Sequence, residues 1–315
     1  MPDVAVHAAF GREVRKSLRK ETGEKIREIP YTFALFGPDV WFMYQPWKRR
    51  EGRGRRMHTT QTGAFLTALA RRVKESRHPE ELFSYLAGFL CHYALDAATH
   101  PYIIYMTEEK YHFPRCHMSF EHSLDILEMK RAGTWGEKHP VTDHFFPKLK
   151  LPASVREDLD AVFLEVYGWE NCWKALNHSC PRYRLCYRVL ENPKGLFSRL
   201  ARRTGHPVLK SLAYSESHFN ETDVENQQRL EWAHSHEPSI RSSANFSEMK
   251  EAARRDAKEL IEAACRYAFL SEISEEELAR QIGSRSYLSG LPVEDPRNMR
   301  VPSLLPPEKK GKVHP

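Results

Sequence analysis

The sequence lacks the features that mark membrane and secreted proteins. No run in its 315 residues approaches the roughly 18 consecutive apolar residues that a membrane span needs. The first residues, Met1 to His7, contain no basic segment followed by an apolar one, which is the pattern of a secretory signal. We therefore expect a cytoplasmic protein with no transmembrane segment.

Cysteine pairs are also missing. The six cysteines include no C-x-x-C pair, and thiols of a cytoplasmic protein are expected to stay reduced. Cys172, Cys180 and Cys186 lie around His178, but their spacing fits no zinc-knuckle pattern. This spacing argues against a metal site in that part of the chain.

Alternation of apolar and polar residues, which is typical of β-strands, is scarce, and helical periodicity dominates instead. The period predicts helices over residues 4–19, 58–76, 80–100, 117–131, 153–167, 181–203, 223–234 and 247–282. Prolines and glycines predict a loop over 30–57. We expect an all-α, multi-helix bundle in which residues 1–283 form a single domain. The tail 284–315 is rich in proline and charge, and we expect it to be disordered.

The predicted helix 80–100 is apolar on nearly every side, which is typical of a helix in the centre of a core. It nevertheless contains His92, Asp96 and His100, four residues apart and therefore on one face. A buried carboxylate must be paired or bound to a metal, because leaving it bare costs several kcal/mol. His117 and Glu121 repeat the same spacing. These spacings indicate a multinuclear zinc site, and hence a hydrolase.

Other histidines are weaker candidates. A lone histidine on a helix is more often a core residue bonded to a backbone carbonyl than a metal ligand. His122 and Asp125, close to His117, are interpreted as surface groups or as neighbours of the ligands. Three more, His112, His139 and His144, fall in polar loops and are not expected to bind metal.

The N-terminal part supplies further candidates in a characteristic order. That order is His7, Gly37-Pro38-Asp39, His58, His92, Asp96, His100, His117 and Glu121. In this order the chain resembles the zinc-dependent phospholipase C family and its relatives, the single-strand-specific zinc nucleases. The resemblance covers roughly residues 2–130, and a weaker match through Trp232, Pro238 and Phe246 follows it. It implies the helical fold of that family, with the buried helix 80–100 at its centre.

The resemblance also implies roles for these residues. Asp39, His58, His92 and Asp96 would hold one zinc, and His100, His117 and Glu121 would hold a second. Asp96 and His7 would bind a third, so that two or three ions are expected. Secreted members of the family use an N-terminal Trp at the third ion, which this sequence lacks. The amine of Pro2, if Met1 is removed, or the side chain of Asp3 could take its place.

The resemblance implies a zinc-dependent phosphoesterase that hydrolyses a phosphodiester through a zinc-bridging hydroxide, with Asp39 accepting a proton. Phospholipid headgroups are the first candidate substrate, with possible contact at a membrane surface. A zinc nuclease or nucleotidase on the same metal core, and a zinc-binding scaffold with no turnover, are the alternatives.

Two neighbouring segments leave their roles open. Aromatic residues at Trp41, Phe42, Tyr44 and Trp47 could pack in the core, or could bind a quaternary ammonium or a nucleobase. The basic run between Lys48 and Arg56 could be a solvated loop or a rim that attracts anions.

Overall fold

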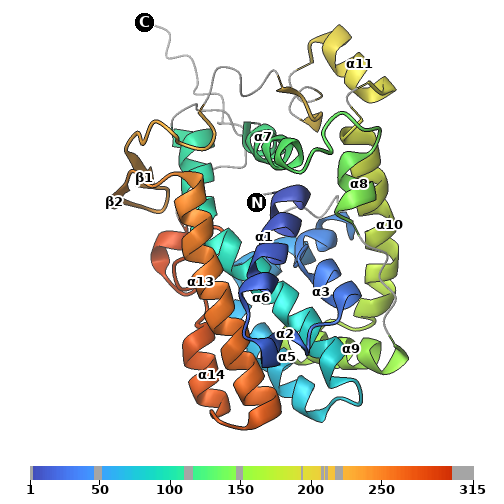
Figure 1. Cartoon of the computed structure of the whole chain (residues 1–315), viewed down its shortest axis with the longest axis vertical. Helices are drawn as coiled ribbons and strands as arrows, with labels where there is room; N and C mark the ends of the chain where they lie inside the picture. The colour runs from blue at the N-terminus through green and yellow to red at the C-terminus, as the bar shows by residue number, and fades with distance from the viewer. Residues whose placement is uncertain are drawn as a thin grey trace, which may run out of the picture.

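The structure is a computed structural model in which helices surround one long central helix (Figure 1). It describes residues 3–45, 52–109, 116–146, 152–192, 194–206, 209, 212–216 and 223–299. The central helix is α6 (Pro79–Ile104), and α1 (Val4–Ser17), α3 (Glu28–Ala34), α5 (Thr62–Glu75) and α13 (Phe246–Cys265) pack against it. The prediction of an all-α fold is confirmed, apart from one small two-stranded sheet.

Helix α6 is buried along most of its length, as its sequence predicts. Pro79 starts it in the first turn, where a missing N–H costs nothing. The helix then passes through Pro101 and ends at Ile104, beyond the predicted end at residue 100. Because Pro101 has no N–H, the carbonyl of Ala97 loses its helical donor at that point. A π-helical segment, η2 (Tyr105–Glu109), continues from the end.

The other elements cover this core. In chain order they are α2 (Lys20–Gly23), η1 (Asp39–Met43), α4 (Arg53–Thr59), α7 (Cys116–Arg131), α8 (Pro140–His144), α9 (Ala153–Tyr167), α10 (Cys172–Leu190), α11 (Leu196–Thr204), η4 (Arg266–Leu270), α14 (Glu275–Ile282) and η5 (Pro296–Met299). Residues from Val4 to Tyr287 share one hydrophobic cluster. Among the described helices, none is both long enough and apolar enough to cross a membrane.

Several predicted boundaries are wrong. The predicted loop 30–57 overlaps α3 and α4 and includes η1. Pro30 lies in the first turn of α3 and does not interrupt it. The predicted helix 181–203 is the end of α10, which runs through Pro181, followed by the separate helix α11. The predicted helix 247–282 is interrupted after Leu270 by Ser271, which has a φ of 53°.

The segment predicted as a helix over 223–234 is also different. It contains turns and the strand β1 (Trp232–His234), which pairs antiparallel with β2 (Glu237–Ser242). Trp232 lies opposite Ser242, and the hairpin packs its Trp232 ring edge-on against Tyr102 of α6. Tertiary packing of this aromatic residue therefore overrides the weak helical period.

The prediction of a disordered tail fails for residues 284–299. Tyr287, Ser286 and Ser289 are almost fully buried, so the chain continues to pack beyond the predicted domain end at 283. Residues 300–315 lie outside the described residues.

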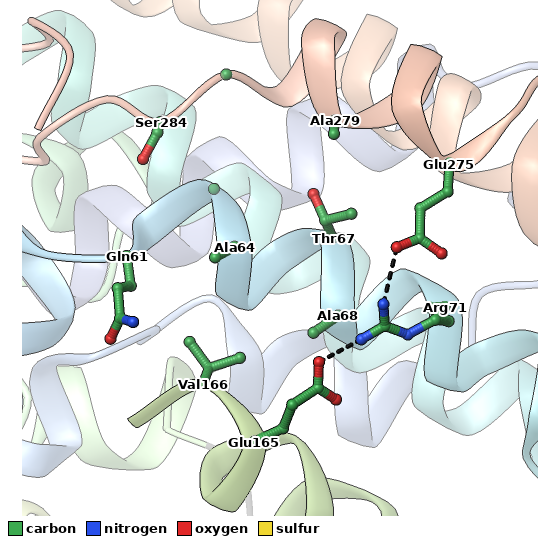
Figure 2. A pocket seen from close by; sticks show the side chains of 12 residues that line it. Gln61, Ala64, Thr67, Ala68, Arg71, Glu165, Val166, Glu275, Ala279 and Ser284 are labelled. Carbon is green, nitrogen blue, oxygen red and sulfur yellow. Dashed lines mark hydrogen bonds and ion pairs between the residues drawn. The ribbon is translucent and has the colours of Figure 1, made fainter. Parts of the chain in front are cut away.

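A shallow groove runs between α5, α9 and α14, lined by Gln61, Thr67 and Ser284 among others (Figure 2). Arg71 of α5 crosses it and forms ion pairs with Glu165 and Glu275. None of the predicted metal ligands lines this groove. Its ion pairs join the three helices, and the candidate site lies elsewhere.

Candidate metal centre

The predicted donors come together in three adjacent groups. Within the described residues, side-chain donors closer than 4.8 Å to one another occur as His7–His92–Asp96, as Asp39–His58–His92 and as His100–His117–Glu121. The donors come from α1, η1, α4, α6 and α7. Helix α6 supplies His92, Asp96 and His100 from one face, as the four-residue spacing predicts.

Asp96 lies at the junction of the first two groups. Its Oδ1 is 3.2 Å from His7 Nε2, and its Oδ2 is 3.1 Å from His92 Nε2 and 3.8 Å from His58 Nε2. Asp39 Oδ1 approaches the same imidazoles, at 3.2 Å from His58 Nε2 and 3.8 Å from His92 Nε2. The two carboxylates therefore share the imidazoles of His58 and His92.

The third group consists of His100, His117 and Glu121. His100 lies on α6, one helical turn after Asp96. His117 Nε2 is 2.9 Å from Glu121 Oε1, and both residues are on α7. His100 Nε2 is 3.9 Å from the same oxygen, and its ring lies parallel to that of His117. Thr107 of η2 places its hydroxyl 3.4 Å from His117 Nδ1. This group therefore has two imidazoles and one carboxylate facing one another.

Backbone carbonyls fix the tautomers of three of these imidazoles. His58 Nδ1 donates to Gly54 O (2.7 Å), His92 Nδ1 to Leu35 O (2.9 Å), and His100 Nδ1 to Tyr287 O (2.7 Å). A proton on Nδ1 leaves the lone pair on Nε2, which is the atom that faces the carboxylates. Metal-binding histidines are typically oriented in this way.

The buried polar atoms at the centre are the evidence that a cation fits here. The Nε2 atoms of His7, His92 and His100, Oδ1 of Asp39 and both oxygens of Asp96 are buried and make no hydrogen bond to any described part of the chain. Buried polar groups are otherwise almost always hydrogen-bonded. Imidazole nitrogens and carboxylate oxygens are donors that suit zinc. The residues present therefore fit bound zinc.

The electrostatics of the cluster agree with this fit. Burial works to raise the pKa of Asp96, but His92 and His100 outweigh it and hold that pKa well below its ordinary value. Burial lowers the pKa of both His100 and His117 well below the usual range for histidine. An ionised carboxylate beside neutral imidazoles is the protonation state that metal binding requires.

The pKa values of the stacked residues His7 and His92 shift in opposite directions. The two rings lie 4.0 Å apart and nearly parallel. Burial and the neighbouring His92 lower the pKa of His7. Burial opposes a charge on His92 as well, but Asp96 and Asp39 outweigh it and raise that pKa. The two carboxylates beside His92 therefore favour positive charge at this point, which a bound cation would supply.

The turn before Asp39 needs a glycine for two reasons. Gly37 has a φ of +42°, which side chains with a Cβ rarely adopt. A Cβ at this position would also lie 2.6 Å from Cγ of His92. Pro38 follows, and Asp39 begins η1 with its carboxylate buried. The Gly-Pro-Asp sequence thus lets this turn approach His92 closely enough for Asp39 to join the cluster.

Of the two N-terminal candidates for a third-ion ligand, the structure describes only Asp3. Pro2 is outside the described residues. Asp3 Oδ1 accepts a hydrogen bond from Val4 N (2.9 Å), and Oδ2 lies 3.0 Å from His122 Nε2. Tyr187 and Tyr214 also donate to the same carboxylate. The structure therefore directs Asp3 away from the three donor groups.

Within the described part of the chain, His139, His144 and His178 belong to none of the three donor groups. His144 pairs with Glu137 at the surface, and His139 lies 3.5 Å from Glu191. His178 is exposed, and His112 is outside the described residues. His122 is buried, which rules out the interpretation that it is a surface group.

Residues of the aromatic segment and of the basic segment pack against each other. Trp41 is fully buried, which supports core packing for this residue, whereas Phe42 is half exposed and packs over His58. Arg53 lies in α4 and not in a loop, and its guanidinium stacks over the rings of Trp41 and Trp169. Trp47 and residues 48–51 are outside the described residues.

Sequence reasoning missed Tyr287. Its carbonyl orients His100, and its amide donates to His58 O at 2.9 Å. The signal available was local, because Ser284 to Leu291 contains no acidic residue and includes one tyrosine and two leucines. The proline and charge content of the whole tail 284–315 led to the prediction of disorder despite this local signal.

Comparison with known proteins follows this geometry. A family model described as zinc dependent phospholipase C matches residues 6–172, just over half of the chain. No curated protein and no solved structure matches the chain.

Proposed function

The chain belongs to the zinc-dependent phospholipase C family, and from that premise we propose that it is a zinc-dependent phosphodiesterase that cleaves the headgroup from phospholipids. One observation carries the proposal: six nitrogen and oxygen atoms of the three donor groups, from His7, Asp39, His92, Asp96 and His100, are buried without hydrogen bonds to the described chain. Such atoms are costly to bury unless a cation satisfies them.

The donors would be divided as the resemblance implies. Asp39, His58, His92 and Asp96 would hold one zinc, and His100, His117 and Glu121 a second. Asp96 and His7 form a separate group with His92, which favours a third position beside the first. Zinc bound here would lower the pKa of a coordinated water and would neutralise charge on the phosphoryl oxygens.

The protein's own residues would supply the remaining functions. Asp39 Oδ1 is the oxygen that faces His58 and His92, so we assign Oδ2 of the same carboxylate as the proton acceptor. The carbonyls bonded to His58, His92 and His100 hold the rings in place and cost no reorganisation during the reaction. Burial of the cluster excludes bulk water and strengthens each electrostatic contact.

The molecular surface favours a lipid interface over a nucleobase. Trp41 is buried and Arg53 covers its ring, so this ring offers no open face for base stacking. Helices α10 and α11 instead expose Leu185, Val189, Leu196 and Leu200. The exposed charged residues on the described part of 182–206 are all basic: Arg182, Lys194, Arg199, Arg202 and Arg203. Exposed leucines flanked by arginines are typical of surfaces that bind anionic lipid.

The test combines metal content with turnover. Wild-type protein, purified without chelator, should contain zinc and should cleave phosphatidylcholine in vesicles faster than bis-p-nitrophenyl phosphate or single-stranded DNA. Asp96→Ala should lose zinc and activity together, because Asp96 contacts two donor groups. Asp143→Ala, at a half-exposed aspartate on α8, is the matched control and should keep both.

Three results would contradict the proposal in different ways. Activity in a zinc-free Asp96→Ala protein would exclude the metal mechanism. Preferred cleavage of single-stranded DNA would favour the nuclease. A full zinc complement with no cleavage of any substrate would identify a scaffold.

A further inference from the structure

Residues 284–293 form a compact turn, which we call the C-terminal strap. Arg285 and Pro292 form an isolated antiparallel bridge, and Ser286 N donates to Leu291 O at 2.8 Å. Val293 N donates to Ser284 O at the same distance. The strap therefore holds its own shape, with the side chain of Tyr287 buried at its tip.

Several contacts fix the base of the strap to the helical core. Arg285 N donates to the hydroxyl of Tyr93 on α6 at 2.8 Å, and its guanidinium pairs with Asp256 of α13 at 2.7 Å. Thr62 of α5 donates its hydroxyl to Arg285 O at 2.8 Å. Three helices thus bind one residue of the strap.

Gly290 brings the strap against α6 beside the metal centre. Its φ is +68°, and a Cβ there would lie 2.5 Å from Ala97 O. This is the carbonyl whose helical donor Pro101 removes. The contact lies between Asp96 and His100 on the helix, so the strap packs where α6 presents its donors.

Tyr287 contacts donors from two different groups. Its carbonyl accepts from His100 Nδ1 and its amide donates to the carbonyl of His58. Its ring centre lies 5.3 Å from that of His58 and 5.8 Å from that of His92. One residue therefore sets the orientation of His100 and packs against two imidazoles of the neighbouring group.

We propose that the C-terminal strap is a structural part of the metal centre and that Tyr287 is the positioning residue which holds His58 and His100 in their metal-binding orientations. This inference rests on the proposed zinc site and extends it beyond residue 172, where the family match ends. Its consequence is that zinc affinity depends on a segment that the matched part of the chain does not include.

Two glycines with the same φ provide the test. Gly290 and Gly168 both have a φ of +68°, but a Cβ on Gly168 would meet nothing within 4 Å. Alanine therefore meets the same unfavourable φ at both positions, and only Gly290→Ala pushes the strap away from α6. Zinc affinity of the full chain is measured by competition with a chromophoric chelator, without substrate.

We expect Gly290→Ala to weaken zinc binding by about ten- to a hundredfold, the range typical when a group that orients a ligand is lost. Gly168→Ala should bind zinc like wild type. Equal affinity in Gly290→Ala and Gly168→Ala would overturn the role of the strap. Wild-type protein that binds no zinc would instead overturn the proposed function, and the strap inference with it.

If Gly290→Ala does not fold, a second variant tests the same inference. Tyr287→Leu keeps the backbone hydrogen bonds and removes the ring that packs against His58 and His92. Circular dichroism of the zinc-free proteins shows which variants are folded. Weaker zinc binding by folded Tyr287→Leu supports the inference, and wild-type affinity contradicts it.

Discussion

A single carboxylate, Asp96, organises the centre of this protein. It is fully buried, and the imidazoles of His7, His58, His92 and His100 all lie within 3.8 Å of its oxygens. Burying a carboxylate without compensation costs several kcal/mol. In the proposed zinc site, a cation bound to Asp96 would offset that cost.

The substitution Gly37→Ala adds one methyl group and tests whether the close contact between Gly37 and His92 is important. Gly37→Ala would place a Cβ 2.6 Å from His92 Cγ, at a φ of +42° that alanine disfavours. We expect the free energy of unfolding to fall by about 1–3 kcal/mol, with a parallel loss of zinc, because the imidazole or Asp39 must shift. Denaturant titration and metal analysis measure the two effects.

Gly133→Ala is the control for Gly37→Ala. Gly133 also has a positive φ, of +72°, but a Cβ on this residue would meet no atom within 4 Å. The control variant should lose only the backbone contribution and keep its zinc. Equal losses of stability and metal in both variants would show that the contact with His92 is unimportant.

At the scale of elements, α7 joins the metal centre to the start of the chain. One part of it carries His117 and Glu121. One turn further on, Asp125 accepts hydrogen bonds from Ala5 N (3.1 Å) and Val6 N (2.9 Å) in the first turn of α1. His7 follows directly after these two residues in α1, so α7 positions donors of two groups at once.

Asp125→Leu tests this link. The variant leaves two buried N–H groups of α1 without their acceptor, and it leaves the hydroxyl of Tyr214, which donates to Asp125 at 2.8 Å, with Asp3 as its other acceptor. We expect a loss of about 2–3 kcal/mol in unfolding free energy, measured by denaturant titration. Asp143→Leu, at a half-exposed position on α8, should change it by less than about 0.5 kcal/mol. A tolerated Asp125→Leu would mean that α1 is held by its apolar face alone.

Regular elements were predictable wherever a local pattern determines them. The helix 153–167 has the predicted limits, and the helices predicted over 4–19 and 117–131 differ by at most two residues at either end. The hairpin at Trp232 was not predictable, because packing against Tyr102 decides its conformation. The break at Ser271 likewise depends on one residue with a positive φ. The helical periodicity of the sequence predicts neither the hairpin nor the break.

The candidate site was predictable to a similar extent. The spacing along α6 and α7 identifies five donors, and the ordered motifs add His7, Asp39 and His58. The composition of 284–291 indicates that this segment packs, but it does not identify the contact with His100, because a backbone carbonyl makes that contact and any residue type supplies one. The buried role of Asp125 was concealed for another reason: its partners are backbone amides 119 and 120 residues away.

At the scale of the whole molecule, the formal net charge of +6 is unevenly distributed. The described part of 182–206 has one acidic residue, Glu191, and this residue is buried among Val141, Thr142 and His139. The exposed face of α10 and α11 is therefore basic, with leucines between its arginines. In Figure 1, α11 lies at one end of the molecule, beyond α8 and α10. That position allows contact with a flat surface.

The two leucines of α11 provide the last prediction. Leu196 is 76% exposed and Leu200 46%, one turn apart on the same face. Burial of a leucine side chain in an apolar phase is worth about 1.5–3 kcal/mol when complete, so the double variant Leu196→Ser/Leu200→Ser should bind anionic vesicles at least about tenfold more weakly. Vesicle sedimentation measures the binding, and hydrolysis of soluble bis-p-nitrophenyl phosphate should be unchanged.

Leu164→Ser provides the matched control, because Leu164 on α9 is 50% exposed but is followed by the acidic Glu165. It should bind vesicles like wild type. Raising the salt concentration should weaken wild-type binding to anionic vesicles, since about 0.15 M salt already screens exposed charges beyond roughly 8 Å. Binding that depends on neither salt nor the α11 leucines would place the lipid-facing surface elsewhere on the molecule. Loss of hydrolysis of the soluble substrate in the double variant would show that α11 acts through the metal centre and not through the membrane.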